Sequence, residues 1–216
     1  MPTSATAQAV SRPQRGAEGR RQLLALAQKQ WLENAQLDLG ALATELGIGR
    51  ATVFRWAGSR DALLGEVIWS FHEPELQAAL AATTLRGPAL MSHMCRCSMQ
   101  SVRDFEPMRR WTEKDPEYAL RILSSESNVI FQRATAFTQA LLDREQGDGF
   151  LQPVMDSAEL ARLLVRIETS FLFSDLACGQ EPSIDSACTA IRVLTEAQPK
   201  PINKQTDNNN SHSGSR

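Results

Sequence analysis

The sequence has few of the residues from which enzyme active sites are usually built. It holds only three histidines, His72, His93 and His212. A glycine-rich phosphate loop, a Gly-x-Ser-x-Gly elbow and a His-Glu-x-x-His motif are all missing from it. A convergent set of acid, base and nucleophile is therefore difficult to assemble, and we predict that the chain is not an enzyme.

Membrane and secretion signals are missing too. No apolar run reaches the roughly 18 residues of a membrane-spanning helix. Residues 1–21 have no apolar core of the kind found in signal peptides. We therefore expect a cytoplasmic protein.

Cysteine is scarce and widely spaced. Cys95, Cys97, Cys178 and Cys188 are too few and too scattered for a disulfide framework in a chain of 216 residues. His93 could share a helix face with Cys97, but such a helix supplies only two ligands where zinc takes about four. Small buried thiols are the simpler interpretation, and we predict neither a metal nor a cofactor.

The pattern that the sequence does contain is helical. Strand-like alternation and Asn-Gly or Asp-Gly hairpins between apolar runs are missing, whereas apolar residues recur with the helical period almost throughout. The predicted helices are Ala17–Asn34, one capped by Asp38, Arg50–Ala57, one capped by Ser59 and ended by Pro74, Gly87–Phe105, a short one from Asp115, Ser125–Gln146, one capped by Asp156 that reaches Cys178, and one capped by Ser183 that reaches Gln198. The predicted fold class is all-α.

Composition and charge divide the chain into four parts. Residues 1–15 and 199–216 are polar and are predicted to be disordered tails. Residues 16–73 form a small helical head, and residues 74–198 form a larger helical body. Residues 1–72 carry eight Arg and Lys against six Asp and Glu, whereas the remainder carries fifteen against nineteen. A mildly basic head on an acidic body is compatible with a polyanion bound at one end.

The head contains the pattern of a helix-turn-helix. Gly47 follows the apolar stripe that ends at Leu46, and a glycine there can take the left-handed conformation that ends a helix. Only three residues then separate this helix from the next, so the two must cross steeply. Val53 and Trp56 lie on the inward face of the second helix, which is the arrangement that places such a helix in the DNA major groove.

The outward face of the second helix carries groups that can meet DNA. Arg50 and Arg55 can reach guanine or phosphate, and Thr52, beside Ala51, can reach phosphate or a thymine methyl group. An ordinary helical corner with solvated arginines is the alternative. The coincidence of the turn, the apolar spacing and the basic face favours DNA binding.

These residues resemble the DNA-binding head of the TetR family of repressors over Leu37–Trp69. Leu42-Ala43, Gly47-Ile48-Gly49, Thr52-Val53-Phe54, Trp56 and Ser59–Leu63 occupy the places of the family motifs. The resemblance implies an N-terminal helix-turn-helix domain and a C-terminal ligand-binding and dimerisation domain. It implies that Arg50, Ala51, Thr52, Phe54, Arg55 and Arg60 contact operator DNA.

Two positions depart from the family pattern. Gly49 replaces the usual Ser, so the recognition helix loses a side-chain N-cap. Phe54 replaces the usual Tyr, which removes a hydroxyl group that bonds a phosphate. We expect the charge of Arg55 to compensate for this loss.

The sequence also resembles a narrower subgroup, the TetR-type regulators of quorum-signal lactone degradation. The segments that carry this likeness are Phe54–Val67 and Phe171–Leu194. We expect a homodimer, because two half-sites on DNA call for two-fold symmetry. The helices from Ser157 and from Ser183 are predicted to pair with their copies as a four-helix bundle.

The body is rich in methionine and aromatic residues, which line adaptable pockets between helices. Asn128 and Glu168 are polar residues at or within apolar runs, where burial without a partner is costly. We predict a small apolar effector with a polar head, plausibly a lactone, that binds among Met94, Phe105, Trp111, Asn128, Phe131, Glu168 and Phe171. Plain core packing is the alternative, and the protein would then be a DNA-binding regulator or scaffold without an effector.

Overall fold

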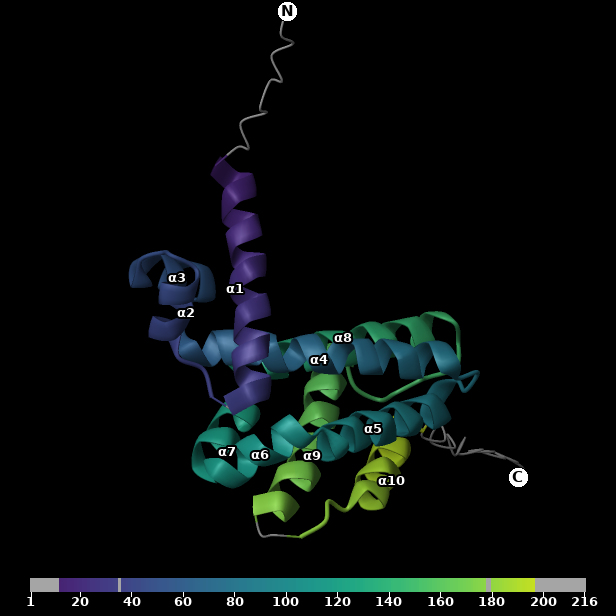
Figure 1. Cartoon of the computed structure of the whole chain (residues 1–216). Coiled ribbons are helices and arrows are strands. Elements are labelled where there is room, and N and C mark those ends of the chain that lie inside the picture. Colours follow the sequence, from purple (N-terminus) through teal and green to yellow (C-terminus); the bar gives the residue numbers. More distant parts are fainter. Residues whose placement is uncertain (1–11, 35, 178–179, 197–216) are drawn as a thin grey trace, which may run out of the picture.

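The computed structural model describes residues 12–34, 36–177 and 180–196, which fold entirely into helices and loops (Figure 1). In chain order the helices are α1 (Arg12–Asn34), α2 (Leu39–Glu45), α3 (Arg50–Ala57), α4 (Arg60–Ala82), α5 (Gly87–Asp104), α6 (Glu106–Lys114), α7 (Pro116–Ser124), α8 (Val129–Gly147), α9 (Ser157–Ala177) and α10 (Ile184–Thr195). The predicted all-α fold is confirmed. The predicted tails lie outside the described residues, except that Arg12 to Arg15 already belong to α1.

The helices form a head and a body that share α4. Helix α1 stands upright with α2 and α3 beside it, and α4 runs across the molecule beneath them (Figure 1). We call α1–α3 the head and α5–α10 the body. The shared helix α4 packs on α5 and α8 of the body, α8 also packs on α9, and α10 packs on α5 and α9.

The turn between α2 and α3 is built as the sequence predicts. Asp38 caps α2 by accepting hydrogen bonds from the N–H groups of Gly40 (2.7 Å) and Ala41 (3.1 Å). Gly47 has a φ of 64°. The N–H of Ile48 bonds the carbonyl of Ala43 at 3.0 Å, and that of Gly47 bonds Thr44 at 3.1 Å. This pair of bonds is the Schellman motif that ends a helix at a left-handed glycine.

Helix α3 is held by its inward side chains. Val53 is fully buried, and Trp56 and Ile48 pack against the same core. Trp56 lies so close to α1 that a Cβ atom added to Gly19 would stand 2.2 Å from its ring. The N-cap Gly49 makes no side-chain bond, so packing rather than capping fixes where α3 lies.

Helix α4 differs from the prediction, because it does not end at Pro74. It continues to Ala82 with Pro74 inside it. Proline removes one backbone N–H and disfavours a helix interior, but the buried side chains of Ile68, Trp69 and Leu76 lie on both sides of it. Burial along the whole helix thus outweighs the local cost. The predicted boundary between residues 73 and 74 falls within this shared helix.

Smaller differences occur in the body. Helix α8 begins at Val129 rather than at Ser125, because Asn128 caps it through a 2.9 Å bond from the N–H of Ile130. The predicted caps Asp115 and Asp156 are both in place, at 3.2 Å from the N–H of Tyr118 and 2.9 Å from that of Ala158.

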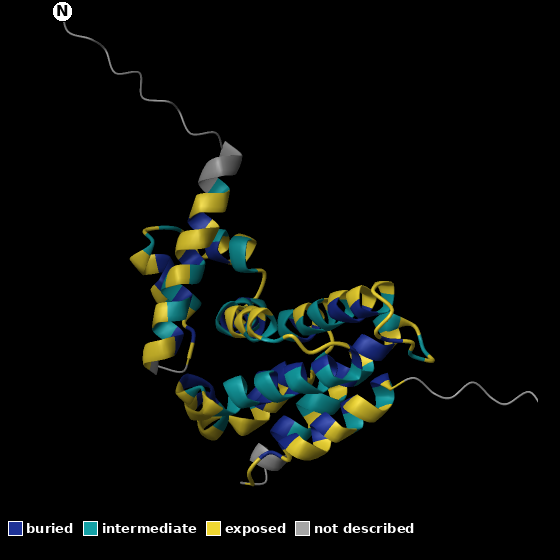
Figure 2. Cartoon of the chain, turned by 90° about the vertical axis from the view of Figure 1, so that its right-hand side faces the viewer, coloured by how far each residue is buried: buried dark blue, intermediate teal, exposed yellow. Residues whose placement is uncertain are grey.

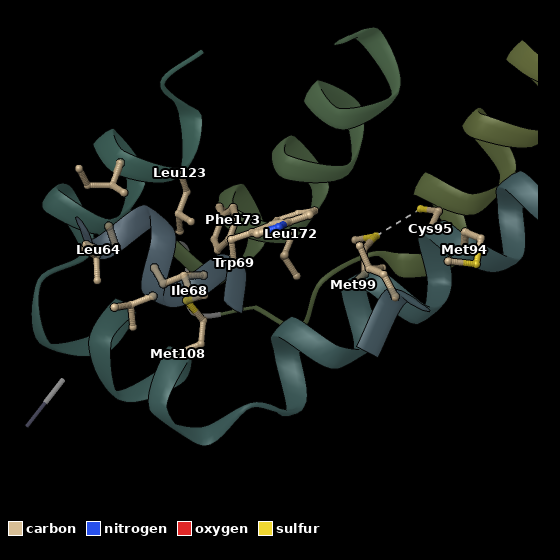
Figure 3. Packing of buried hydrophobic residues seen from close by; sticks show 14 of the residues in the cluster. Leu64, Ile68, Trp69, Met94, Cys95, Met99, Met108, Leu123, Leu172 and Phe173 are labelled. Carbon is tan, nitrogen blue, oxygen red and sulfur yellow. Dashed lines mark hydrogen bonds between the residues drawn. The ribbon is translucent and has the colours of Figure 1, made fainter. Parts of the chain in front are cut away.

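One hydrophobic core runs through both parts. It extends from Leu23 in α1 to Ile191 in α10, and buried residues occur in both the head and the body (Figure 2). Figure 3 shows the section where Ile68 and Trp69 of α4 lie near Met108, Leu123 and Phe173. Head and body are therefore joined by packing.

A covered carboxylate ties the end of α8 to the start of α5. Glu145 has no exposed surface and lies 3.0 Å from Arg86 and 3.1 Å from Arg144. It also accepts a 2.8 Å bond from the N–H of Gly87. Burial alone would raise the pKa of Glu145, but the Gly87 N–H and the two guanidinium groups outweigh it and lower the pKa. Glu145 is therefore ionised and fully partnered.

Candidate functional sites

The predicted DNA-contacting residues share one outward surface of the head. We call Arg50, Ala51, Thr52, Phe54 and Arg55 the recognition surface. Four of these residues are exposed and Thr52 is half-buried, while Val53 between them is fully buried. Phe54 is 50% exposed. The arrangement can present two cations and an aromatic ring to a groove of DNA.

Arg50 also neighbours the start of α2. Its guanidinium group lies next to Gly40 and Asp38. The pKa of the Asp38 carboxyl is lowered, mainly by the N–H groups of Ala41 and Gly40, with Arg50 and Arg60 adding to the effect. The positive charge of Arg50 is thus held near the helix-turn-helix crossing.

Arg60 lies at the joint between head and body. Its Nε donates to the carbonyl of Leu37 at 3.0 Å, and its guanidinium carbon stands 5.1 Å from the ring centroid of Tyr118. Tyr118 in turn donates to Asp61 at 2.7 Å. A phosphate contact by Arg60 would have to use its remaining donors, so its position is less free than that of Arg50 or Arg55.

The body encloses a cavity of about 100 Å³, which we call the body pocket. Its walls come from α4–α10 and are mainly apolar. Among the lining residues are Ile68, His72, Met91, Met94, Cys95, Ser98, Met108, Phe131, Phe137, Thr138, Leu164, Glu168 and Phe173. Aliphatic side chains form the largest part of the surface, sulfur-containing and aromatic side chains add to it, and only a few groups are polar.

Two of those polar groups have strongly shifted pKa values. Burial raises the pKa of Glu168 to about 7. Glu168 is half-buried and lines the body pocket. Burial also lowers the pKa of His72 to about 4. At neutral pH the imidazole is uncharged and the carboxyl group is poised between its two forms.

A second cavity, of about 340 Å³, lies at the joint of α4, α5 and α6. We call it the joint cavity. It shares Ile68, His72, Val102 and Met108 with the body pocket. The joint cavity lies within the range of about 300–1,000 Å³ that ligand pockets occupy, whereas the body pocket is smaller.

The joint cavity borders an aromatic cluster that reaches the head. Phe71 and Phe105 line it. Trp31 of α1 stacks on Phe71 with centroids 6.0 Å apart and lies 5.9 Å from Phe105. Arg110 adds a polar tie, since it donates to the carbonyl of Leu32 at the end of α1. A ligand in this cavity would therefore contact Phe71 and Phe105, the two side chains on which Trp31 of α1 packs.

The predicted effector residues divide into two groups. Met94, Phe131 and Glu168 line the body pocket, and Phe105 lines the joint cavity. Trp111, Asn128 and Phe171 line neither. Asn128 serves as the cap of α8 and packs on Gly65 of α4; Trp111 is buried edge-on against Tyr118.

Sequence reasoning did not single out His72 or Ser98 as pocket residues. His72 Nε2 lies 3.1 Å from the hydroxyl of Ser98, and its Nδ1 lies 3.2 Å from that of Ser101. These bonds join α4 to α5 across 26 and 29 residues of sequence, and no local pattern indicates them.

Comparison with known proteins now identifies the family. Residues 86–196 match the family model of the tetracyclin repressor-like C-terminal domain. The chain belongs to the TetR family. Its structure is similar to that of the R. erythropolis transcriptional repressor QsdR from the TetR family, with a TM-score of 0.77 and 27% identity over 85% of this chain and 98% of that one. The comparison with curated proteins gives no match.

Membership of the TetR family supports the coarse functional predictions. TetR-family regulators bind operator DNA, act as dimers and are in general not enzymes. Among the described residues, no helix is long and apolar enough to cross a membrane. Within the same residues, no three His, Cys, Asp or Glu side chains are grouped to hold a metal ion.

Proposed function

We propose that this TetR-family protein is a repressor that a small effector releases from its operator. The observation that carries the proposal is the place of His72. This residue lines both cavities and belongs to α4, the helix shared by head and body. A ligand among the body helices therefore touches the helix on which the head is mounted.

The switch follows from this geometry. A ligand that displaces His72 or Phe71 shifts α4 and the Trp31 contact that seats α1. In a dimer, such a shift changes the distance between the two recognition surfaces. Two heads held off the half-site spacing cannot both enter the major groove, so operator affinity falls.

The dimer would form through α9 and α10, as the sequence predicts. Val193 of α10 is 61% exposed, and Leu163 and Ile167 of α9 are half-buried at the edge of its outward face. We propose that these apolar side chains, which lie among the exposed Arg162, Arg166 and Arg192, pack against a second copy. Each copy would bring one recognition surface to the DNA.

The effector would be a small, mostly apolar molecule with a polar head. A lactone is our candidate. The support is the likeness of Phe54–Val67 and Phe171–Leu194 to regulators of quorum-signal lactone degradation, together with an apolar pocket that contains few polar groups.

The experiment is a linkage measurement. Operator DNA is first selected from a random library with the full-length protein. The affinity for γ-nonalactone is then measured by calorimetry with and without that operator. A coupling of about 3 kcal/mol would weaken both equilibria about a hundredfold, because coupling is reciprocal. Equal affinities in the two titrations would favour the alternative, a DNA-binding regulator or scaffold without an effector.

A further inference from the structure

The body pocket has an unusual charge balance. Its walls include one carboxyl group, Glu168, and neither arginine nor lysine. The titratable groups that face Glu168 are His72 from α4 and Cys95 from α5, while the lining residues of α6, α7, α8 and α10 contribute none. His72 is uncharged at neutral pH, and burial raises the pKa of the Cys95 thiol far above its usual range. No arginine or lysine side chain therefore lines this pocket to balance a negative charge.

The hydrogen bonds of His72 tie α4 to α5 beside Glu168. His72 Nδ1 lies 3.2 Å from the Ser101 hydroxyl, and Nε2 lies 3.1 Å from the Ser98 hydroxyl. The Ser101 hydroxyl also lies 2.9 Å from the backbone carbonyl of Ser98. A neutral imidazole has one N–H and one acceptor nitrogen, so His72 donates to one of these serines and accepts from the other.

Burial decides the protonation of Glu168. The Ser98 hydroxyl, as a donor near Glu168, lowers the pKa of the carboxyl group, but burial outweighs this bond and raises the pKa to about 7. Because neither arginine nor lysine lines the pocket, no side-chain cation there stabilises the ionised form. The pocket thus holds a carboxyl group that can carry its own proton and offer it to a ligand.

We infer that the body pocket takes an uncharged effector with a hydrogen-bond acceptor, and that Glu168 is the specificity-determining contact that admits it and rejects carboxylates. The inference rests on the proposed effector function of the same pocket. A carboxylate would be buried beside an acid with no counter-ion, which is costly. An amine would have to ionise Glu168 and bury the resulting pair, and the desolvation of such pairs offsets their attraction.

The test uses three probes with one nine-carbon chain. They are γ-nonalactone, its ring-opened form 4-hydroxynonanoate, and nonylamine, each titrated into the full-length protein at pH 6 and pH 8. We expect the lactone to bind at least about thirtyfold more tightly than either charged probe. Its affinity should fall about tenfold from pH 6 to pH 8, because only the protonated form of Glu168 is competent. Equal lactone affinity at the two pH values would overturn the inference.

Glu168→Gln separates the donor role from a counter-ion role. The amide keeps a donor and cannot ionise, so the variant should bind the lactone as the native protein does at pH 6, at both pH values. Glu113→Gln, on the exposed side of α6, should leave the pH dependence unchanged. Tightest binding by nonylamine, increasing with pH and lost in Glu168→Gln, would show instead that Glu168 is an ionised counter-ion.

The Tm measured without ligand distinguishes the inference about Glu168 from the proposed effector function of the pocket. If Glu168 is held in its protonated form, the Tm of Glu168→Gln should exceed that of the native protein by an amount that grows from pH 5 to pH 8. A constant difference would overturn the inference about Glu168. If no probe binds while the difference does grow, the effector function of the pocket is wrong and the state of Glu168 is right.

Discussion

The head and the body hold their polar functional groups in opposite environments. Arg50 and Arg55 stand in water on the recognition surface, whereas Glu168 and His72 face enclosed cavities with shifted pKa values. The exposed surface can change without a large effect on folding. The enclosed groups are coupled to packing, so a ligand that changes them also acts on the helices that carry them.

The largest expected effect concerns a buried charge of the body. Glu145→Ala leaves the guanidinium groups of Arg86 and Arg144 and the N–H of Gly87 without their acceptor. We expect the free energy of unfolding to fall by about 3 kcal/mol, at the low end for a broken buried pair because Glu145 lies just under surface arginines. Urea denaturation at pH 7 measures it.

Asp148→Ala is the matched control for this change. Asp148 also pairs with Arg86, but it is exposed, and exposed pairs contribute little. A loss below about 0.5 kcal/mol is expected. Equal losses in the two variants would contradict the view that burial makes the ion pairs of the body different from those of the surface.

The second prediction tests the exposed side of the comparison. The double change Arg50→Ala and Arg55→Ala should weaken operator binding about a hundredfold and lower the slope of affinity against salt. The Tm should stay within about 2 °C of the native value, because surface substitutions seldom affect stability. Fluorescence anisotropy over a salt series measures the binding.

Arg109→Ala removes the same kind of charge from the exposed face of α6, and it should leave operator affinity unchanged. Undiminished binding by the double variant would exclude the recognition surface as the DNA contact. A large fall in its Tm would show instead that Arg50 supports the start of α2.

The sequence predicts the head better than the body, because the features of the head depend on residues that are close together in the chain. The turn at Gly47 and the cap at Asp38 depend on neighbours within a few residues, so local patterns predict them. Pro74 shows the limit of local reasoning, because buried side chains spread along α4 decide that the helix continues.

The body pocket depends on pairings between distant helices. Glu168 could be identified because a charge inside an apolar run needs an explanation. Asn128 fitted the same reasoning, but its explanation is the cap of α8. Ser98 gave no signal, since its role is defined only by His72 across the α4–α5 contact. Polarity in an apolar run therefore predicts that a group has a partner and does not say which.

The third prediction examines whether the head is packed as tightly as the body. Gly19→Ala adds a Cβ atom that would stand 2.2 Å from the ring of Trp56. An indole ring cannot give way as a flexible tip does, so we expect a loss of about 2 kcal/mol from overpacking. Gly16→Ala, with open space around it, should instead stabilise α1 slightly through helix propensity. Equal stability of the two variants would contradict the close α1–α3 contact.

The smallest effect, and the most specific, is a pair of opposite pH slopes within the body. Burial lowers the pKa of His72 from 6.5 to about 4. The folded state therefore disfavours protonation of the imidazole, and the free energy of unfolding decreases as pH falls from 6.5 towards 4. Burial raises the pKa of Glu168 from 4.5 to about 7, so its contribution is lost as pH rises through that range. Between about pH 4.5 and 6.5 the two slopes cancel in the native protein.

Single variants should uncover each slope. His72→Asn leaves the Glu168 slope alone, so its free energy of unfolding should fall as pH rises from 5 to 6.5. Glu168→Gln leaves the His72 slope alone and should gain stability over the same interval, by about 1–2 kcal/mol. Urea denaturation at three pH values measures both curves, and contributions of other groups cancel against the native protein. Parallel curves for the native protein and both variants would mean that neither group is shielded by the body, and the contrast with the exposed recognition surface would disappear.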